Sequence, residues 1–219
     1  MRFIYEASKL RRVAKVSKVP ADRDNGEVID HALNLLARRG FDPTTMEQIA
    51  DATGLSEHAL TQHFPDKTAI VMSVVADIAV AIGAAVADIP PEVGPQDALF
   101  LADVAVIDDI ARGIGVVTPE RMQTLAHIVS ACPALRGQAM AAAKPILAKA
   151  LAERMGVEPD DPHVRLATDI SAAIVAGSYN VSAHTNANND GRIPENMTRR
   201  LRDIYVRITG ARPPAPPAG

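Results

Sequence analysis

The chain has 219 residues and a formal net charge of −3, with 47% hydrophobic and 3% aromatic residues. This length allows one large domain or two modest ones. The apolar share supports a sizeable core, which must be built from Ala, Val, Ile and Leu because there is no Trp. The net negative charge excludes a strong global attraction to nucleic acid. A single cysteine, Cys132, excludes an intramolecular disulfide framework and fits a reducing cytoplasm.

Residues 1–20 form a basic arm with six Lys or Arg residues and one Glu, a net charge of +5. No apolar run of secretory length follows it, so we do not expect a signal peptide. Later apolar stretches, such as 78–87, contain Gly83 and are too short to span a bilayer, so we expect a cytoplasmic protein without a membrane partner. The arm either contacts DNA phosphates or a minor groove, or is a solvated leader.

Residues 25–67 are predicted to form three short helices with tight joints. Gly40 can take the left-handed conformation that ends the first helix. Thr44 and Glu47 have the spacing of a capping box, so the second helix is expected over 45–52. Apolar residues three and four positions apart share one face of the first helix: Val28, Ile29, Ala32, Leu33 and Leu36.

The second and third helices have the pattern of a helix-turn-helix. Gly54 provides the turn, and Ser56 can cap a third helix that runs to His63. The positions expected to be buried are Ile49, Ala50, Leu55, Leu60 and Phe64. The side chains that then point outward can form hydrogen bonds in a major groove: Glu57, His58, Thr61 and Gln62. The alternative is an ordinary helical hairpin with a solvated face.

Two runs of sequence, ALNLLARRGFDPTTMEQIADATGLS and HFPDKTAI, resemble the DNA-binding domain of the TetR (tetracycline-repressor) family of bacterial transcription regulators. The later part of the chain is compatible with the family in length and helicity but has no motif of its own. Thr61 stands where many relatives have a phosphate-contacting Tyr. Glu57 stands where a basic or neutral residue is frequent; its carboxylate repels phosphate but can accept from a cytosine amino group.

The resemblance implies an all-α fold of about nine helices. Its expected parts are the arm (1–20), a helix-turn-helix DNA-binding domain (21–67), a helical effector-binding and dimerisation domain (68–210) and a disordered tail (211–219). The N-termini of the second and fourth helices would hold the DNA backbone, and the third helix would read bases. The expected DNA-binding residues are Thr44, Thr45, Ser56, Glu57, His58, Thr61, Gln62, His63 and Lys67. Residues 21–67 hold nine acids against four bases, so this domain needs cations from elsewhere, such as the arm.

Beyond residue 67 the sequence predicts long, Ala-rich helices separated by Pro- and Gly-containing loops. Pro145 lies inside one of them and should kink it. The expected helical ranges are 68–89, 97–112, 118–131, 133–155, 163–185 and 194–208, with a polar loop over 186–192.

The later helices are expected to form an effector pocket and a two-fold dimer interface. Each residue assigned to either site could instead be an ordinary core residue. The candidate pocket residues are Met122, Leu125, His127, Met140, Tyr179, Asn180 and His184. The candidate interface residues are Ile170, Ala173, Ile174, Gly177, Val181, Leu201, Ile204, Tyr205 and Ile208.

Three classes of function follow. The first is a regulator, usually a repressor in this family, that binds a pseudo-palindromic double-stranded DNA operator as a homodimer and is released by a small molecule. The second is a TetR-like helical protein that binds a lipid or other apolar ligand but no DNA. The third, an enzyme, lacks support because there is no Ser/His/Asp or Cys/His arrangement, phosphate loop or metal-ligand spacing. No cofactor or metal is expected.

Overall fold

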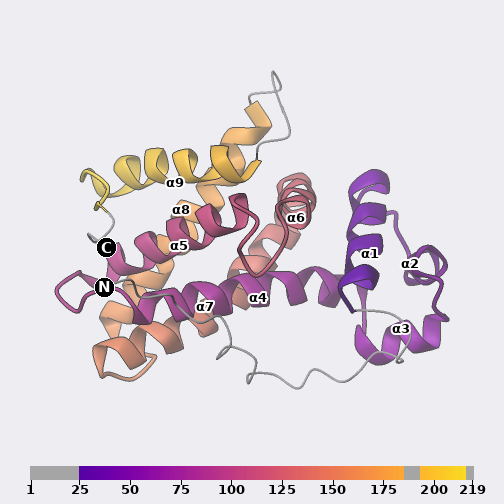
Figure 1. Ribbon diagram of the computed structural model, residues 1–219, viewed down its shortest axis with the longest axis horizontal. Helices are drawn as coiled ribbons and strands as arrows, with labels where there is room; N and C mark the ends of the chain where they lie inside the picture. Colours follow the sequence, from indigo (N-terminus) through magenta and orange to yellow (C-terminus); the bar gives the residue numbers. More distant parts are fainter. Residues whose placement is uncertain (1–24, 185–192, 216–219) are drawn as a thin grey trace, which may run out of the picture.

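The computed structural model describes residues 25–184 and 193–215, and within them the chain forms nine helices and no strand (Figure 1). This confirms the all-α prediction. The helices are α1 (Asn25–Arg39), α2 (Met46–Thr53), α3 (Glu57–His63), α4 (Lys67–Ala87), α5 (Pro95–Ala111), α6 (Pro119–Ala131), α7 (Pro133–Met155), α8 (Pro162–His184) and α9 (Ile193–Thr209). The basic arm, the loop over 186–192 and residues 216–219 lie outside the described residues.

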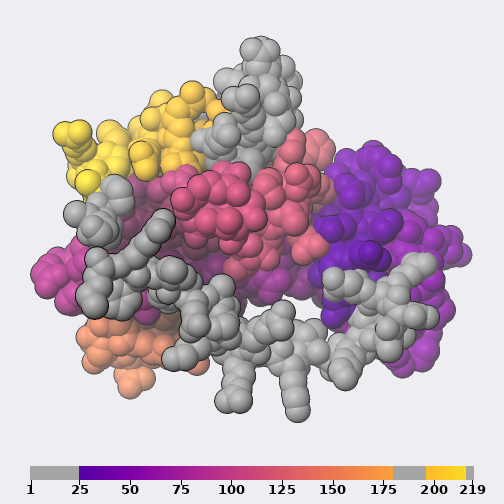
Figure 2. Space-filling view, in the orientation of Figure 1, coloured from indigo at the N-terminus to yellow at the C-terminus, as the bar shows by residue number. Residues whose placement is uncertain are grey.

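Helices α1 to α3 form a small unit at one end of the molecule, coloured indigo to purple in Figures 1 and 2. Its centre is made by the apolar positions that the sequence pattern singles out, with Leu33, Ile49 and Leu60 fully buried. Leu55 is half-buried and packs against the edge of this core. Gly40, with φ of 89°, and Gly54, with φ of 65°, end α1 and α2 in the left-handed conformation that favours glycine.

The capping box that opens α2 lies one residue later than predicted. Thr45 accepts a hydrogen bond from the Gln48 amide at 3.2 Å, and the Gln48 side chain accepts one from the Thr45 amide at 3.3 Å. Thr44 is instead 1% exposed, and its hydroxyl donates to the Gly40 carbonyl at 2.7 Å. The predicted pairing of Thr44 with Glu47 is therefore wrong, because the turn at Gly40 draws the Thr44 side chain inward.

Helix α4 leads from the small unit into the remaining helices, where it packs mainly against α7 and α5 (Figure 1). By length and composition, Glu57–Ala87 is the one stretch of the described residues that could cross a membrane, against our expectation that every apolar run is too short. The buried residues of α4 include Val71, Val74 and Ile82. They pack in the protein core, and the core helix of a soluble protein passes the same length and composition test.

Helix α5 is held to α8 and α9 through three carboxylates along its length. Because α5 also contacts α4 and α7, it lies in the middle of the larger helical part. The hydrogen bonds run from Tyr205 to Asp97, from Ser171 to Asp103 at 3.1 Å and from Thr198 to Asp108 at 2.7 Å.

Candidate nucleic-acid interface and internal cavity

Helix α3 is a short helix anchored on one side and polar on the other. Ser56 caps it by accepting from the Ala59 amide at 3.2 Å, and Leu60 fixes it to the core. His58 and Gln62 are exposed one turn apart, with their Nε2 atoms 3.1 Å apart. Glu57 is also exposed. This face can therefore offer donors and acceptors to a partner without disturbing the core.

Thr61 and His63 are less exposed to solvent than the other residues of α3 that are predicted to contact DNA. Both are half-buried, and the Thr61 hydroxyl donates to the carbonyls of Glu57 at 2.9 Å and His58 at 3.1 Å. A hydroxyl has one hydrogen to donate, so in this geometry Thr61 can still accept a hydrogen bond or offer its methyl group to a base.

Lys67 ties the start of α4 to the loop between α1 and α2. Its Nζ donates to the carbonyls of Phe41 at 2.7 Å, Asp42 at 3.0 Å and Thr44 at 2.9 Å. The ammonium group also lies 4.7 Å from the centre of the Phe41 ring. An ammonium has three N–H donors, and these three carbonyls use all of them. In this structure the Lys67 side chain therefore stabilises the loop between α1 and α2, and its predicted contact with DNA stays a prediction.

Two of the predicted phosphate-contacting residues lie at the N-terminus of α2. Thr44 is buried, whereas Thr45 is exposed where the first amides of α2 and the helix dipole favour an anion. At the N-terminus of α4, Asp66 accepts from the Ala69 amide at 2.8 Å, so a carboxylate already occupies this end. The described part of the module, residues 25–67, has seven acids and three bases.

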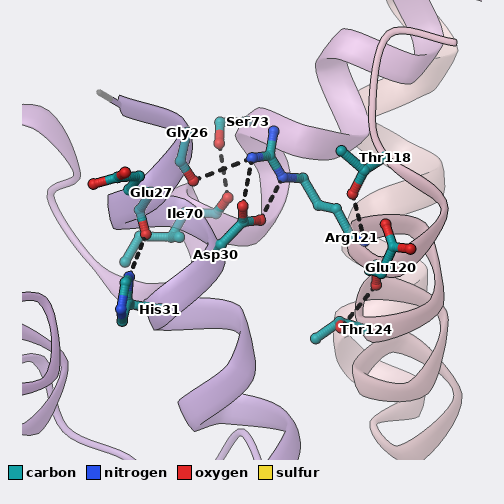
Figure 3. A network of polar contacts seen from close by, with 10 residues as sticks. All are labelled: Gly26, Glu27, Asp30, His31, Ile70, Ser73, Thr118, Glu120, Arg121 and Thr124. Atoms are coloured by element: carbon teal, nitrogen blue, oxygen red, sulfur yellow. Dashed lines mark hydrogen bonds and ion pairs between the residues drawn. The ribbon is translucent and has the colours of Figure 1, made fainter. Parts of the chain in front are cut away.

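Arg121 of α6 connects the larger helical part to α1 (Figure 3). Its Nε lies 2.6 Å from Asp30 Oδ1, one terminal nitrogen lies 2.9 Å from Asp30 Oδ2, and the same nitrogen donates to the Gly26 carbonyl at 3.1 Å. Burial raises the pKa of Asp77 on α4, and the Arg121 charge opposes that rise. Arg121 therefore acts on both α1 and α4, where the two parts of the chain meet.

A cavity of about 90 Å³ lies within the larger helical part, with walls from α4 to α9. This is several times the ~10–15 Å³ that one water needs on the same measure. Four predicted pocket residues line it: Met122, Leu125, Met140 and Tyr179. His127 is exposed and lies outside the lining, a correction to its predicted place. The side chains of Asn180 and His184 lie outside the described residues.

The cavity also contains polar groups that the sequence reasoning missed. Asp103 is 4% exposed and accepts from Ser171 at 3.1 Å. Burial raises the pKa of Asp103 to about 7, and the Ser171 hydrogen bond opposes the rise. Burial likewise raises the pKa of Tyr179 to about 12. Lys144 stands at the rim, paired with Asp169. Neither the cavity nor any other part of the described chain has a group of three or more His, Cys, Asp or Glu that could hold a metal ion.

Some of the predicted dimer-interface residues on α8 and α9 lie in the core of the protomer, and others lie on its surface. Ile174, Leu201 and Tyr205 are buried within the protomer, which corrects their assignment to a dimer surface. Gly177 lets α9 approach α8, because a Cβ there would lie 3.1 Å from Ile204 Cγ2. Ala173 and Ile208 are exposed, Ile170 is half-buried, and Leu166 beside them is 60% exposed. The Val181 side chain lies outside the described residues.

Comparison with known proteins connects this architecture to one group. Residues 28–74 match the family model of bacterial regulatory proteins, tetR family. The chain is 27% identical over 143 residues to the HTH-type transcriptional regulator TcmR of Streptomyces glaucescens, a match that spans 64% of this chain and 63% of TcmR. The matched part is thus under two-thirds of that relative's length.

Two solved structures share the overall fold. SmeT, the repressor of the Stenotrophomonas maltophilia multidrug efflux pump SmeDEF, superposes with a TM-score of 0.54 and 15% identity over 90% of this chain and 97% of SmeT. A TetR-family regulator from Streptomyces coelicolor A3 superposes with a TM-score of 0.51 and 19% identity, over 81% of this chain and 92% of that chain. At these identities the likeness concerns the fold.

Proposed function

We propose that this chain is a TetR-family, sequence-specific DNA-binding transcriptional regulator that responds to a small molecule, because residues 28–74 match the family model and 143 residues are 27% identical to the regulator TcmR. The observation that carries the proposal is α3, a capped helix anchored by Leu60 that exposes Glu57, His58 and Gln62. A helix of this kind fits a major groove, where such side chains discriminate base pairs. The site of action would be the bacterial cytoplasm, with the protein on the nucleoid when DNA-bound.

The proposed DNA contacts have two tasks. Thr45 and the N-terminal amides of α2 would hold a phosphate, and the basic arm would supply cations that the acidic module lacks. Phosphate contacts place the protein, and base contacts give it specificity. The proposed base readers and flanking contacts are Ser56, Glu57, His58, Thr61, Gln62 and His63.

Helix α6 supports a route from the cavity to the DNA-binding module. Met122 and Leu125 line the cavity, and Arg121 beside them holds Asp30 of α1. A ligand that fits the cavity better in one placement of α6 would favour the matching placement of α1. Release of DNA on ligand binding would make the protein a repressor.

Two DNA-binding modules would be joined in a homodimer through the surface parts of α8 and α9. Leu166, Ala173 and Ile208 are exposed apolar residues on these helices, and Ile170 is half-buried among them. A two-fold axis here would present two copies of α3 to a pseudo-palindromic operator.

A second candidate is a helical protein that binds an apolar ligand and no DNA. The acids that outnumber bases in residues 25–67 favour it, and so does the engagement of Lys67 by three carbonyls. An unneutralised acidic surface repels a phosphate backbone. DNA binding must be measured directly to decide between the two candidates.

Fluorescence anisotropy of the full chain on the DNA upstream of its own gene tests the proposal, with a shuffled duplex of equal length as the control. We expect tight binding to the native duplex that weakens with salt. The absence of binding to any duplex, with a folded dimeric protein, would favour the second candidate.

A further inference from the structure

Asp103 is a buried acid in an otherwise mostly apolar cavity. The residues that α4, α6 and α9 contribute to the lining are all apolar. Its partner in the structure is the Ser171 hydroxyl, 3.1 Å from Oδ2. A buried carboxylate is costly unless it is paired with a cation or well hydrogen-bonded. Asp103 therefore marks the place in the cavity where a ligand's positive charge would be most stabilised.

The other ionisable groups around the cavity do not neutralise Asp103. Lys144 of α7 stands at the rim, has a side chain 40% exposed, and pairs with Asp169 outside. Tyr179 of α8 is neutral at physiological pH, since burial raises its pKa to about 12. The charge of Arg136 acts on Tyr179 from outside the lining.

We propose that the cavity binds an amphiphile with an apolar body and a protonated amine, whose ammonium group pairs with the Asp103 carboxylate. This inference rests on the proposed function, because it names the class of effector. A ligand with a carboxylate head would meet the Asp103 charge inside and find Lys144 already paired at the rim. A neutral apolar ligand would leave the carboxyl group without a charged partner.

Proton exchange accompanies this binding. When Asp103 is a carboxylic acid in the empty cavity, pairing with an ammonium ion releases its proton to solvent. Affinity therefore rises with pH until Asp103 is ionised. For a carboxyl group with a pKa of about 7, the ionised fraction grows about tenfold between pH 6 and pH 8, and the apparent affinity grows with it.

The test uses isothermal titration calorimetry of the full chain with hexylamine, octylamine and decylamine, and with octanol and octanoate as matched probes. We expect at least one amine to bind more tightly than both octyl controls, with an affinity about tenfold higher at pH 8 than at pH 6. Equal binding of amine and alcohol, tighter binding of octanoate, or no binding of any amine would overturn the inference.

Asp103→Asn removes the charge with little change in shape. It should lower amine affinity about tenfold or more at pH 8 and abolish the pH dependence. The matched control is Asp109→Asn, which neutralises a partly exposed acid, paired with Arg112, on the same helix outside the cavity and should bind amines as the wild type does. Unchanged amine binding by a folded Asp103→Asn protein would also overturn the inference.

DNA anisotropy on the same preparations separates this inference from the proposed function. Amine binding without DNA binding supports the ligand class and contradicts the regulator. DNA binding without amine binding contradicts the ligand class alone. Both activities, with DNA released by the amine in the wild type but not in Asp103→Asn, would support both.

Discussion

The guanidinium of Arg121 on α6 holds the carboxylate of Asp30 on α1 through two hydrogen bonds of 2.6 and 2.9 Å. This pair joins residues 91 positions apart. The Arg121 side chain is 15% exposed, so water screens the pair less than it would a pair fully on the surface. Since the neighbours of Arg121 on α6 line the cavity, this ion pair connects the cavity wall to α1, in addition to the connection that α4 makes.

A double-mutant cycle should detect this link. Replacing Arg121 by Gln, Asp30 by Asn, and both together should give a coupling energy of about 1 kcal/mol in urea unfolding, since bidentate Arg–carboxylate pairs exceed ordinary surface pairs. The exposed pair of Lys149 and Glu153 serves as the control cycle, with coupling near zero. Equal coupling energies in both cycles would show that the interaction between Arg121 and Asp30 is no stronger than that of an exposed surface pair.

Lys67→Met should destabilise the DNA-binding module without removing a phosphate contact. The loss of three hydrogen bonds from an ammonium group should lower the free energy of unfolding by roughly 2–3 kcal/mol. DNA affinity should fall equally on all sequences, because the Thr44 carbonyl next to the exposed Thr45 is no longer held in place. The salt dependence of binding should keep its slope. If the slope of log affinity against log salt concentration instead falls in magnitude by about one, Lys67 neutralises a phosphate.

Gln62→Ala should relax sequence preference. Gln62 is exposed on α3, where it can form a bidentate pair with a base. Affinity for the best duplex should fall by about 1–3 kcal/mol, with little change on non-specific DNA. Duplexes with single base-pair changes locate the affected position. His31→Ala, at an exposed site on α1, is the control. A uniform loss on every duplex would assign Gln62 to the backbone.

The stability of the wild type should fall with pH relative to Asp103→Asn. Burial raises the folded-state pKa of Asp103 to about 7, so the folded protein retains a proton that the unfolded chain loses above its own pKa of 3.8. As the pH rises from about 5 to about 7, Asp103 should lower the wild type's free energy of unfolding by roughly 2 kcal/mol relative to Asp103→Asn. Urea unfolding of both proteins at each pH measures the difference. A constant difference would show that Asp103 is not buried as a neutral acid.

Leu166→Glu should weaken the proposed dimer. Leu166 is 60% exposed on α8, and a carboxylate there would be buried against its symmetry mate. Light scattering at micromolar concentration should show a dimeric wild type and a largely monomeric variant. Val80→Glu, on exposed α4 surface, should remain dimeric. A monomeric wild type would contradict the two-fold arrangement itself.

Local signals in the sequence predicted most of the helices. Ser56 caps α3 and Gly40 ends α1 as expected, because each choice depends on adjacent residues. The α2 cap was misplaced because two adjacent threonines both have a partner three residues on. Thr44 is not the cap because its hydroxyl donates to the Gly40 carbonyl, and residue spacing in the sequence does not predict the position of that carbonyl.

The cavity was predicted less well because it depends on how six helices pack. Met122 and Leu125 are three residues apart on one face of α6, whereas His127 falls on the opposite, exposed face. The periodicity of α6 could have excluded His127. Asp103 was missed, although a lone acid within the apolar run ALFLADVAVI is a usable sign of a functional carboxyl group.

Selection of duplexes from a random pool by the full chain tests sequence-specific DNA binding by α3 without requiring the operator to lie near the gene. We expect enrichment of a pseudo-palindrome whose half-sites lie about one helical turn or a multiple apart, and loss of that enrichment in Gln62→Ala. Repeated rounds that enrich no sequence, with a folded dimeric protein, would contradict sequence-specific DNA binding by α3.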